Sequence, residues 1–287
     1  MEADILDKGS LGQQKSLLKS YEEVFFPTIG GLYNYGVFFK PEGEGPFPAV
    51  IVVHGGLGEG FQPREEAIIS KPRVRDALLK EGYAVFIIDY RRHDFGGLEV
   101  DDVISAFEHL RSRSDVIADK IAFVGGSHGG YLVMRAVMRI RAAAAIVYAG
   151  LIDIEKIFLQ KGSDISRRWA AQEIARELKE RYGSNVEAYR NLSIHTHAAE
   201  IKSPILYVIG TEDPIFPQLP ALRQAMEKAE KTLGVSIHPG MPHGFYWGKK
   251  REVTKEGPNR EEEFQKSISK TIEFLKKHMG PGARVKG

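Results

Sequence analysis

The stretch FVGGSHGGYL, residues 123–132, places four glycines around one serine. An apolar run, residues 121–124, leads into it, and a helical pattern follows. Where a strand turns sharply into a helix, the two backbones come so close that side chains would clash, and glycine removes that clash. The G-x-S-x-G spacing therefore predicts that the Ser127 hydroxyl stands clear at the end of a strand. The helix N-terminus and the amide of His128 would face the position where negative charge develops.

Glycine-rich turns of other kinds bind phosphate, and two of them are excluded here. Neither residues 125–130 nor HGGLGEG at 54–60 has glycine at the first, third and sixth positions that a dinucleotide site requires. No G-K-S or G-K-T follows either stretch, which also excludes a P-loop.

A serine hydroxyl is a weak nucleophile at neutral pH, so it needs a base in contact with it and a third group that orients the base. His243, in PGMPHGF at 239–245, follows the last core strand and precedes the last long helix. A loop in this place can bring an imidazole onto the serine, and His243 is therefore predicted to be the base. Structural or surface positions are expected for His93, His109, His195, His197, His238 and His278.

The orienting carboxylate is expected after a core strand, between the serine and the histidine. ILYVIGTEDPIF, residues 205–216, supplies Asp213 directly before Pro214, with Glu212 as the neighbouring rival. Asp213 is predicted because the following proline biases its backbone towards an extended conformation.

A second amide is needed to hold an oxyanion beside that of His128. IVVHGGLGEG, residues 51–60, places two glycines at the end of a strand expected at 49–53. The N–H of Gly56 is predicted to be this donor, with Leu57 as the alternative.

Apolar, β-rich runs recur along the chain, and helical patterns separate most of them from the third onward. Helices with one apolar stripe, at the i, i+3, i+4 spacing, are predicted at 100–110, 132–140, 222–229 and 264–279. Alternation of strands with helices predicts an α/β fold with a mostly parallel sheet of eight strands. The strands are expected near 22–26, 33–39, 49–53, 84–89, 121–125, 143–149, 205–210 and 235–238.

Residues 151–200 interrupt this alternation. A helix is predicted at 165–182, which Gly183 can end. We interpret the segment as a small helical cap inserted in a single domain, residues 1–287. The cap and the aromatic run at 245–247 could shape a substrate pocket, although ordinary core packing explains the aromatic run at least as well.

Composition excludes several other classes of protein. The formal net charge of the 287 residues is +2, which gives no electrostatic case for nucleic acid or an anionic membrane. There is no cysteine, so disulfides and thiolate chemistry are absent. No signal peptide or membrane-spanning run is recognised, and the cytoplasm is the expected location. No cofactor and no metal are predicted.

Several segments of the chain together resemble a known family. Five segments carry the resemblance, in the order PFPAVIVVHGG, FIIDYR, DKIAFVGGSHGGYL, ILYVIGTED and PHGF. This order is similar to that in the catalytic domain of the prolyl oligopeptidase family. The family is an α/β-hydrolase group that includes acylaminoacyl peptidases and single-domain esterases. The resemblance covers about residues 22–279. It implies that Ser127 is the nucleophile, Asp213 the acid and His243 the base, with oxyanion amides from Gly56 and His128.

Two classes of function follow from these residues. The favoured one is a serine carboxylic-ester hydrolase acting through an acyl-enzyme on a small-molecule ester, and a peptidase of the same family is the alternative. About twenty residues precede the first expected strand, too few for the β-propeller of the family's peptidases, and this favours the esterase. The other class is a ligand-binding protein on a hydrolase fold.

Overall fold

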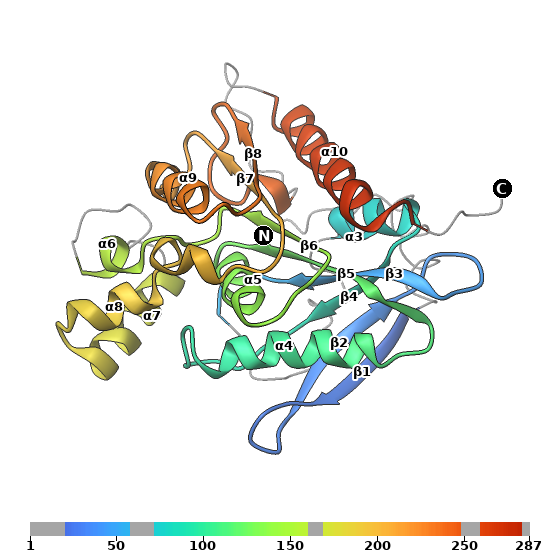
Figure 1. Cartoon of the computed structure of the whole chain (residues 1–287), viewed down its shortest axis with the longest axis horizontal. Coiled ribbons are helices and arrows are strands. Elements are labelled where there is room, and N and C mark those ends of the chain that lie inside the picture. Colours follow the sequence, from blue (N-terminus) through green and yellow to red (C-terminus); the bar gives the residue numbers. More distant parts are fainter. Residues whose placement is uncertain (1–20, 58–71, 160–168, 248–258, 283–287) are drawn as a thin grey trace, which may run out of the picture.

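The computed structural model of the chain describes residues 21–57, 72–159, 169–247 and 259–282 (Figure 1). Its centre is one sheet with the strand order β1-β2-β4-β3-β5-β6-β7-β8. β1 and β2, and β2 and β4, pair antiparallel, and every other neighbouring pair is parallel. This confirms the predicted α/β fold. The strands are β1 (Tyr21–Pro27), β2 (Tyr33–Phe39), β3 (Phe47–Val53), β4 (Ala84–Ile88), β5 (Val116–Gly126), β6 (Ala144–Tyr148), β7 (Ile205–Gly210) and β8 (Leu233–His238).

Four inner strands of the sheet are buried along their whole length. Every residue of β3, β4, β6 and β7 is buried, as expected where helices cover both faces of a parallel sheet. β5 begins at Val116, five residues before the predicted strand at 121–125, because Val116 still pairs with Phe47 of β3 across a register shift. Residues 117–120 carry exposed or half-buried side chains, so no apolar pattern predicted that they belong to the strand.

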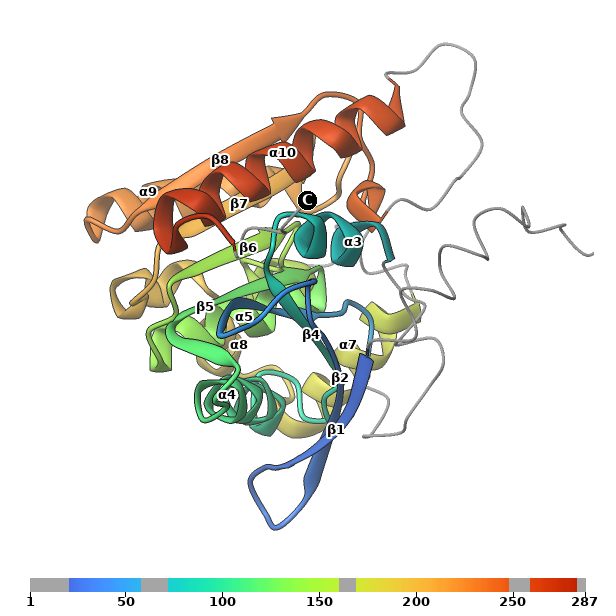
Figure 2. The same cartoon turned by 90° about the vertical axis from the view of Figure 1, so that its right-hand side faces the viewer.

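Helices cover the two faces of the sheet (Figure 2). α3 (Pro72–Lys80) and α10 (Arg260–Met279) pack together on one face, and α4 (Leu98–Arg111) and α5 (His128–Arg139) on the other. α9 (Leu219–Lys228) packs beside β8. α5 and α10 each begin four residues before the predicted helix, because their first turns carry no apolar stripe. α3 was not among the predicted helices.

The described parts of the segment 151–200, residues 151–159 and 169–200, form helices (Figure 1). They are α6 (Ile154–Phe158), α7 (Trp169–Tyr182), α8 (Val186–Leu192) and the 3-10 helix η2 (His195–Glu200). α7 is the described part of the helix predicted at 165–182; residues 165–168 lie outside the described residues. Glu177 of α7 accepts a hydrogen bond from the Phe95 amide, in the loop after β4, at 2.8 Å. The segment therefore contacts the carboxyl edge of the sheet, but its role as a substrate cap stays a prediction.

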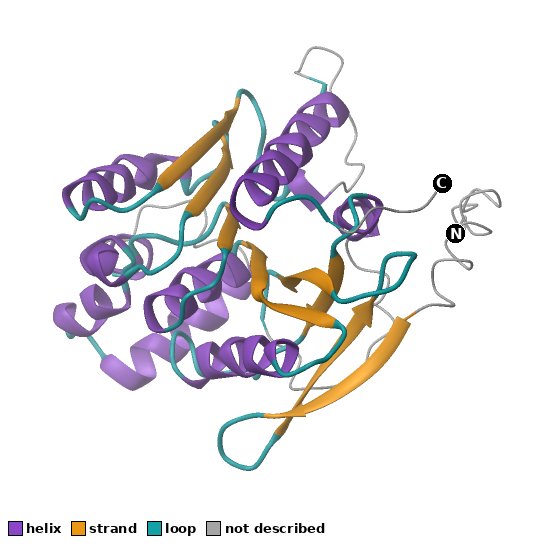
Figure 3. Ribbon diagram, turned by 45° about the vertical axis from the view of Figure 1, so that its right-hand side comes forward, coloured by secondary structure: helices purple, strands orange, loops and turns teal. Residues whose placement is uncertain are grey.

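The β1–β2 hairpin projects beyond the rest of the sheet (Figure 3). It is tied to the body by Asp102 of α4, which is fully buried. The Asp102 carboxylate accepts hydrogen bonds from the Thr28 hydroxyl at 2.7 Å and from the Arg91 guanidinium at 2.7 and 2.8 Å. A buried carboxylate of α4 thus holds the antiparallel edge of the sheet in place.

Within the four described ranges, no helix is long and apolar enough to cross a bilayer. The same ranges hold no group of three histidine or acidic side chains arranged to bind a metal ion. The cytoplasmic location, the single domain and the absence of a cofactor stay predictions.

Candidate active site

Ser127 occupies the turn between β5 and α5. Its backbone has φ 55° and ψ −121°, a conformation that a residue with a side chain rarely adopts. Two backbone hydrogen bonds hold this turn, from the Ser127 amide to the Tyr148 carbonyl at 2.8 Å and from the Tyr131 amide to the Ser127 carbonyl at 3.0 Å. The strained backbone lifts the hydroxyl off the end of the strand.

The glycines around Ser127 are required by close approach of backbones. A Cβ added at Gly125 would lie 2.5 Å from the Gly129 carbonyl oxygen, and one added at Gly129 would lie 2.2 Å from the His54 carbonyl oxygen. No side chain fits at either place, because these distances are well below van der Waals contact. The first turn of α5 therefore packs directly against the ends of β3 and β5.

His243 joins Ser127 to Asp213. Its Nε2 lies 2.9 Å from Ser127 Oγ, and its Nδ1 lies 2.8 Å from Asp213 Oδ2. The other carboxylate oxygen of Asp213 accepts the Ile215 amide at 2.9 Å. The Asp213 side chain is fully buried and the His243 side chain is 7% exposed. Asp213 can therefore keep the proton on Nδ1 and leave Nε2 free to accept the proton of the serine.

Two loops bring Asp213 and His243 together. The Thr211 amide donates to the His238 carbonyl at 3.0 Å, and the Glu212 amide donates to the Met241 carbonyl at 3.1 Å. The loop after β7 is thereby fastened to the loop after β8. The Glu212 side chain points outward and is exposed, so the structure brings Asp213, and not its neighbour, to the histidine.

The loop after β3 lies directly against the serine. A Cβ built on Gly55 would be 3.1 Å from Ser127 Cβ. Gly56 follows with φ 88°, and the amide of His128 opens α5, where a helix leaves its first N–H groups without partners inside the helix. The loop that carries one predicted oxyanion donor thus lies against the serine and the other donor follows it directly, and their role in catalysis belongs to the proposal below.

The sequence analysis did not identify two buried carboxylates whose histidine partners contact the loop after β3. Glu99 Oε1 lies 2.8 Å from His128 Nε2, and Asp89 Oδ1 lies 3.1 Å from His54 Nε2. Burial raises the pKa of Glu99, although the imidazole of His128 opposes that shift. Burial alone would lower the pKa of His128, but the Glu99 carboxylate outweighs it and the pKa is raised. In the sequence, Glu99 looks like an ordinary acidic residue in the first turn of a helix.

The aromatic run at 245–247 belongs to the core in its described part. Phe245 and Tyr246 are buried, and the Tyr246 ring stacks on Tyr148 with centroids 4.8 Å apart. Tyr246 also meets the His243 ring edge-on at 6.3 Å. The aromatic residues therefore support the base from behind. The Trp247 side chain lies outside the described residues.

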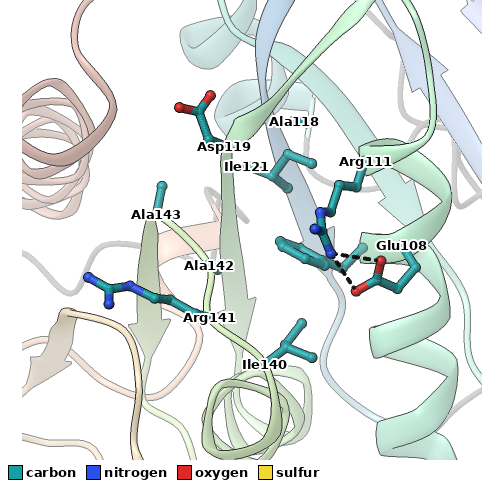
Figure 4. A pocket seen from close by; sticks show the side chains of 10 residues that line it. Glu108, Arg111, Ala118, Asp119, Ile121, Ile140, Arg141, Ala142 and Ala143 are labelled. Atoms are coloured by element: carbon teal, nitrogen blue, oxygen red, sulfur yellow. Dashed lines mark hydrogen bonds and ion pairs between the residues drawn. The ribbon is translucent and has the colours of Figure 1, made fainter.

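A cavity of about 520 Å³ lies away from this site (Figure 4). Its lining comes from the end of α4, the first half of β5 and the connection between α5 and β6, which lie at the amino edge of the parallel strands. Ser127 follows the carboxyl end of β5. The Arg111 guanidinium is paired with Glu108, and Arg141 points away from both. This cavity is not where a substrate would meet Ser127.

Comparison with known proteins identifies the family of this chain. The model of the prolyl oligopeptidase family matches residues 75–271, more than half of the chain. Acylamino-acid-releasing enzyme 1 of Oryza sativa subsp. japonica is 23% identical over 221 residues, which are 69% of this chain and 27% of that protein. The chain therefore spans about a quarter of the length of this curated relative.

Solved structures share the fold. An acylaminoacyl peptidase of Pyrococcus horikoshii matches with a TM-score of 0.72 and 21% identity, over 98% of this chain and 45% of that one. Esterase 2 of Thermogutta terrifontis, phosphonylated by sarin, matches with a TM-score of 0.68 and 21% identity, over 92% of this chain and 96% of that one. Both likenesses concern the fold alone, so they leave open which bond is cleaved.

Proposed function

Because the chain belongs to the prolyl oligopeptidase family of serine hydrolases, we propose that it is a carboxylesterase that uses Ser127, His243 and Asp213 as its catalytic triad. One observation carries the proposal. The serine, the imidazole and the buried carboxylate are joined by contacts of 2.9 and 2.8 Å.

The reaction follows from this arrangement. Ser127 Oγ bonds to the ester carbonyl carbon while its proton passes to His243 Nε2, and the amides of Gly56 and His128 stabilise the oxyanion. The C–O bond to the alcohol breaks as His243 returns the proton to the leaving oxygen. Water then adds to the acyl-enzyme, His243 takes its proton, and the bond to Ser127 breaks as that proton returns to Oγ. The products are an alcohol and a carboxylic acid.

The charges beside the site favour a neutral substrate. Among the described residues, three buried carboxylates beside the triad and the oxyanion loop, Asp213, Glu99 and Asp89, each pair with a histidine. A peptidase that cuts near a free amino terminus needs a carboxylate to bind the ammonium group, and these three are already engaged. An ester also loses an alkoxide more readily than an amide loses an amine.

The experiment compares one acyl group on two leaving groups. Purified protein is assayed with the p-nitrophenyl ester and the p-nitroanilide of the same short acyl group, alongside Ser127→Ala. We expect ester turnover far above anilide turnover, and loss of turnover to near background in Ser127→Ala with the same melting temperature. Efficient anilide cleavage with negligible ester cleavage would establish the peptidase instead.

A second readout separates an enzyme from a binding protein. A fluorophosphonate labels a serine only where a base has activated it. We expect stoichiometric labelling of the wild type and none of Ser127→Ala. Labelling that persists in Ser127→Ala would move the nucleophile to another residue, and a wild type that is neither labelled nor active would leave the ligand-binding function.

A further inference from the structure

Gly56, the predicted oxyanion donor, needs something to hold it. Glycine can adopt the φ of 88° found here, but it can adopt other conformations as easily. A Cβ at this position would meet no atom within 4 Å. Outside its chain neighbours, no atom therefore packs against this side of Gly56. An oxyanion donor is effective only when it is oriented before the charge forms. The restraint must come from hydrogen bonds to the neighbouring carbonyl groups.

The His128 side chain supplies such a bond. Its Nδ1 lies 2.7 Å from the Gly56 carbonyl oxygen, and a carbonyl only accepts, so Nδ1 carries a proton. The Tyr90 hydroxyl donates to the same oxygen at 3.2 Å. The Phe95 ring lies against the imidazole, with centroids 5.0 Å apart and planes 25° apart, and this fixes the plane of the ring.

Glu99 holds the other side of the imidazole. Its Oε1 lies 2.8 Å from His128 Nε2 and also accepts the Gly96 amide at 2.6 Å. Both side chains are almost completely buried, at 2% and 4% exposure. Burying such a pair carries a desolvation cost that packed apolar side chains would avoid. A pair kept at that cost beside the nucleophile points to a task other than stability.

We propose that the His128 side chain, fixed by Glu99, is a positioning residue that holds the carbonyl of the Gly56–Leu57 peptide and thereby keeps Gly56 and its N–H at one spacing from the His128 amide. This inference rests on the proposed ester hydrolysis. One residue then joins both halves of the oxyanion hole: its backbone N–H is one donor, and its side chain fixes the loop that carries the other. The class of ligand is the tetrahedral oxyanion of an acyl transfer.

The peptide on the other side of Gly56 is held in the same way. His54 Nδ1 lies 3.0 Å from the Gly55 carbonyl oxygen, and His54 Nε2 lies 3.1 Å from Asp89 Oδ1. Because the N–H and C=O of a trans peptide point in opposite directions, fixing the Gly55 carbonyl orients the Gly56 N–H. Two carboxylate–imidazole–carbonyl chains thus clamp one glycine from both sides.

The test changes the donor at residue 128. His128→Leu removes it, whereas His128→Asn keeps a side-chain N–H at the place of Nδ1 and gives up the contact with Glu99. Both variants keep the backbone amide. For a p-nitrophenyl ester we expect His128→Leu to lower kcat about 10- to 100-fold with KM nearly unchanged, in the range known for misplaced or missing oxyanion donors. His128→Asn should recover kcat to within about fivefold of the wild type.

Two measurements exclude a merely structural role. kcat is expressed per serine titrated with a fluorophosphonate, so unfolded protein does not count. A trifluoromethyl ketone, which forms an oxyanion on the serine, should bind more weakly to His128→Leu in parallel with kcat/KM. Asp102→Asn, another buried carboxylate of α4, serves as the control and should lower the melting temperature without changing kcat per titrated serine.

Equal kcat in His128→Leu and the wild type, or equal loss in His128→Leu and His128→Asn, would overturn the inference while leaving ester hydrolysis intact. Loss of kcat in Asp102→Asn comparable to that in His128→Leu would overturn it as well, since any damage to α4 would then suffice. If His128→Leu does not fold, Glu99→Leu is used, and unchanged kcat there has the same consequence. An inactive wild type contradicts the proposed function itself.

Discussion

Three buried histidines in this chain are held by a carboxylate, and each has a different second partner. The second ring nitrogen faces a serine hydroxyl in His243, the backbone carbonyl of the oxyanion loop in His128, and the Ser236 hydroxyl in His238. The same pair of side chains can thus activate a nucleophile, position a peptide or stabilise a strand end. The pairs are His243 with Asp213 at 2.8 Å, His128 with Glu99 at 2.8 Å and His238 with Glu263 at 2.7 Å.

The first prediction at the residue scale concerns the acid. Asp213→Asn keeps the shape of the side chain but can donate to Nδ1, which turns the imidazole to the wrong tautomer. In a serine protease with the same triad, the change from Asp to Asn lowers kcat about 10⁴-fold, which raises the activation barrier by roughly 5 kcal/mol. We expect a loss of similar order here, because Asp213 is fully buried and bonds directly to His243. The measurement is kcat on one aryl ester.

Glu212→Gln is the matched control for that prediction. Its side chain is exposed, and only its backbone contributes to the loop contact with Met241. We expect kcat to change less than about twofold, as for an ordinary surface substitution. A crippled Glu212→Gln beside a mild Asp213→Asn would move the acid by one residue.

At the scale of single elements, the apolar patterns of the sequence predicted most of the strands and helices, and the three residues predicted at their ends, Ser127, Asp213 and His243, lie in contact. The patterns could not predict what α4 does. Its stripe correctly indicates a buried face, but Glu99 and Asp102 are also buried, because His128 at the start of α5 and Arg91 in the loop after β4 satisfy them. Contacts between residues far apart in the sequence leave no periodic signal. For the same reason, no pattern showed that the HGG loop is clamped.

The start of β5 offers a prediction for an element. Arg113 donates to Asp115 at 2.8 and 3.0 Å, and Lys40 lies 3.5 Å away. The hydrogen bonds from Arg113 hold the pKa of Asp115 below its usual range, although burial opposes the shift. A depressed folded pKa contributes stability above the unfolded pKa, and that contribution is lost as the pH falls through the folded value.

Asp115→Asn should therefore lower the free energy of unfolding by about 1 kcal/mol at pH 7, a modest figure because solvent screens a partly exposed pair. The difference from the wild type should shrink below about pH 4, where the carboxyl of the unfolded chain is protonated. Urea titrations at pH 7 and pH 3 measure both values. Asp119→Asn, an exposed carboxylate on the same strand, should change neither. A difference that stays constant down to pH 3 would show that the Asp115 charge contributes nothing.

At the scale of the whole molecule, the sheet and its attachments differ in how they are held. Every residue of β3 and β7 is buried, whereas α7 buries Ile174 and Leu178 and is joined to the loop after β4 by a few polar contacts. Glu177 accepts the Phe95 amide and also pairs with Arg181 at 3.0 Å, and Arg181 reaches Asp94 at 2.9 Å. Because Phe95 stacks on His128, these contacts connect the helical segment to the oxyanion loop.

Regions held by few contacts open locally before the whole chain unfolds. Glu177→Ala removes a hydrogen bond to a charged acceptor, worth about 1.5 to 3 kcal/mol, and each 1.4 kcal/mol is about a tenfold change in an equilibrium. We therefore expect amide hydrogen exchange in residues 94–97 and 169–182 to accelerate about tenfold or more. Exchange in β3, β5 and β6 should stay as slow as in the wild type.

Glu180→Ala provides the comparison, since Glu180 is on the same helix and exposed. It should leave exchange in both segments unchanged, which separates loss of the Phe95 contact from a change in helix propensity. If exchange accelerated equally in the central strands, the helical segment and the sheet would unfold as one unit. If neither segment responded to Glu177→Ala, the contact between Glu177 and Phe95 would not hold α7 to the body. The expected pattern instead requires that the segment over the carboxyl edge opens on its own while the sheet keeps the triad assembled.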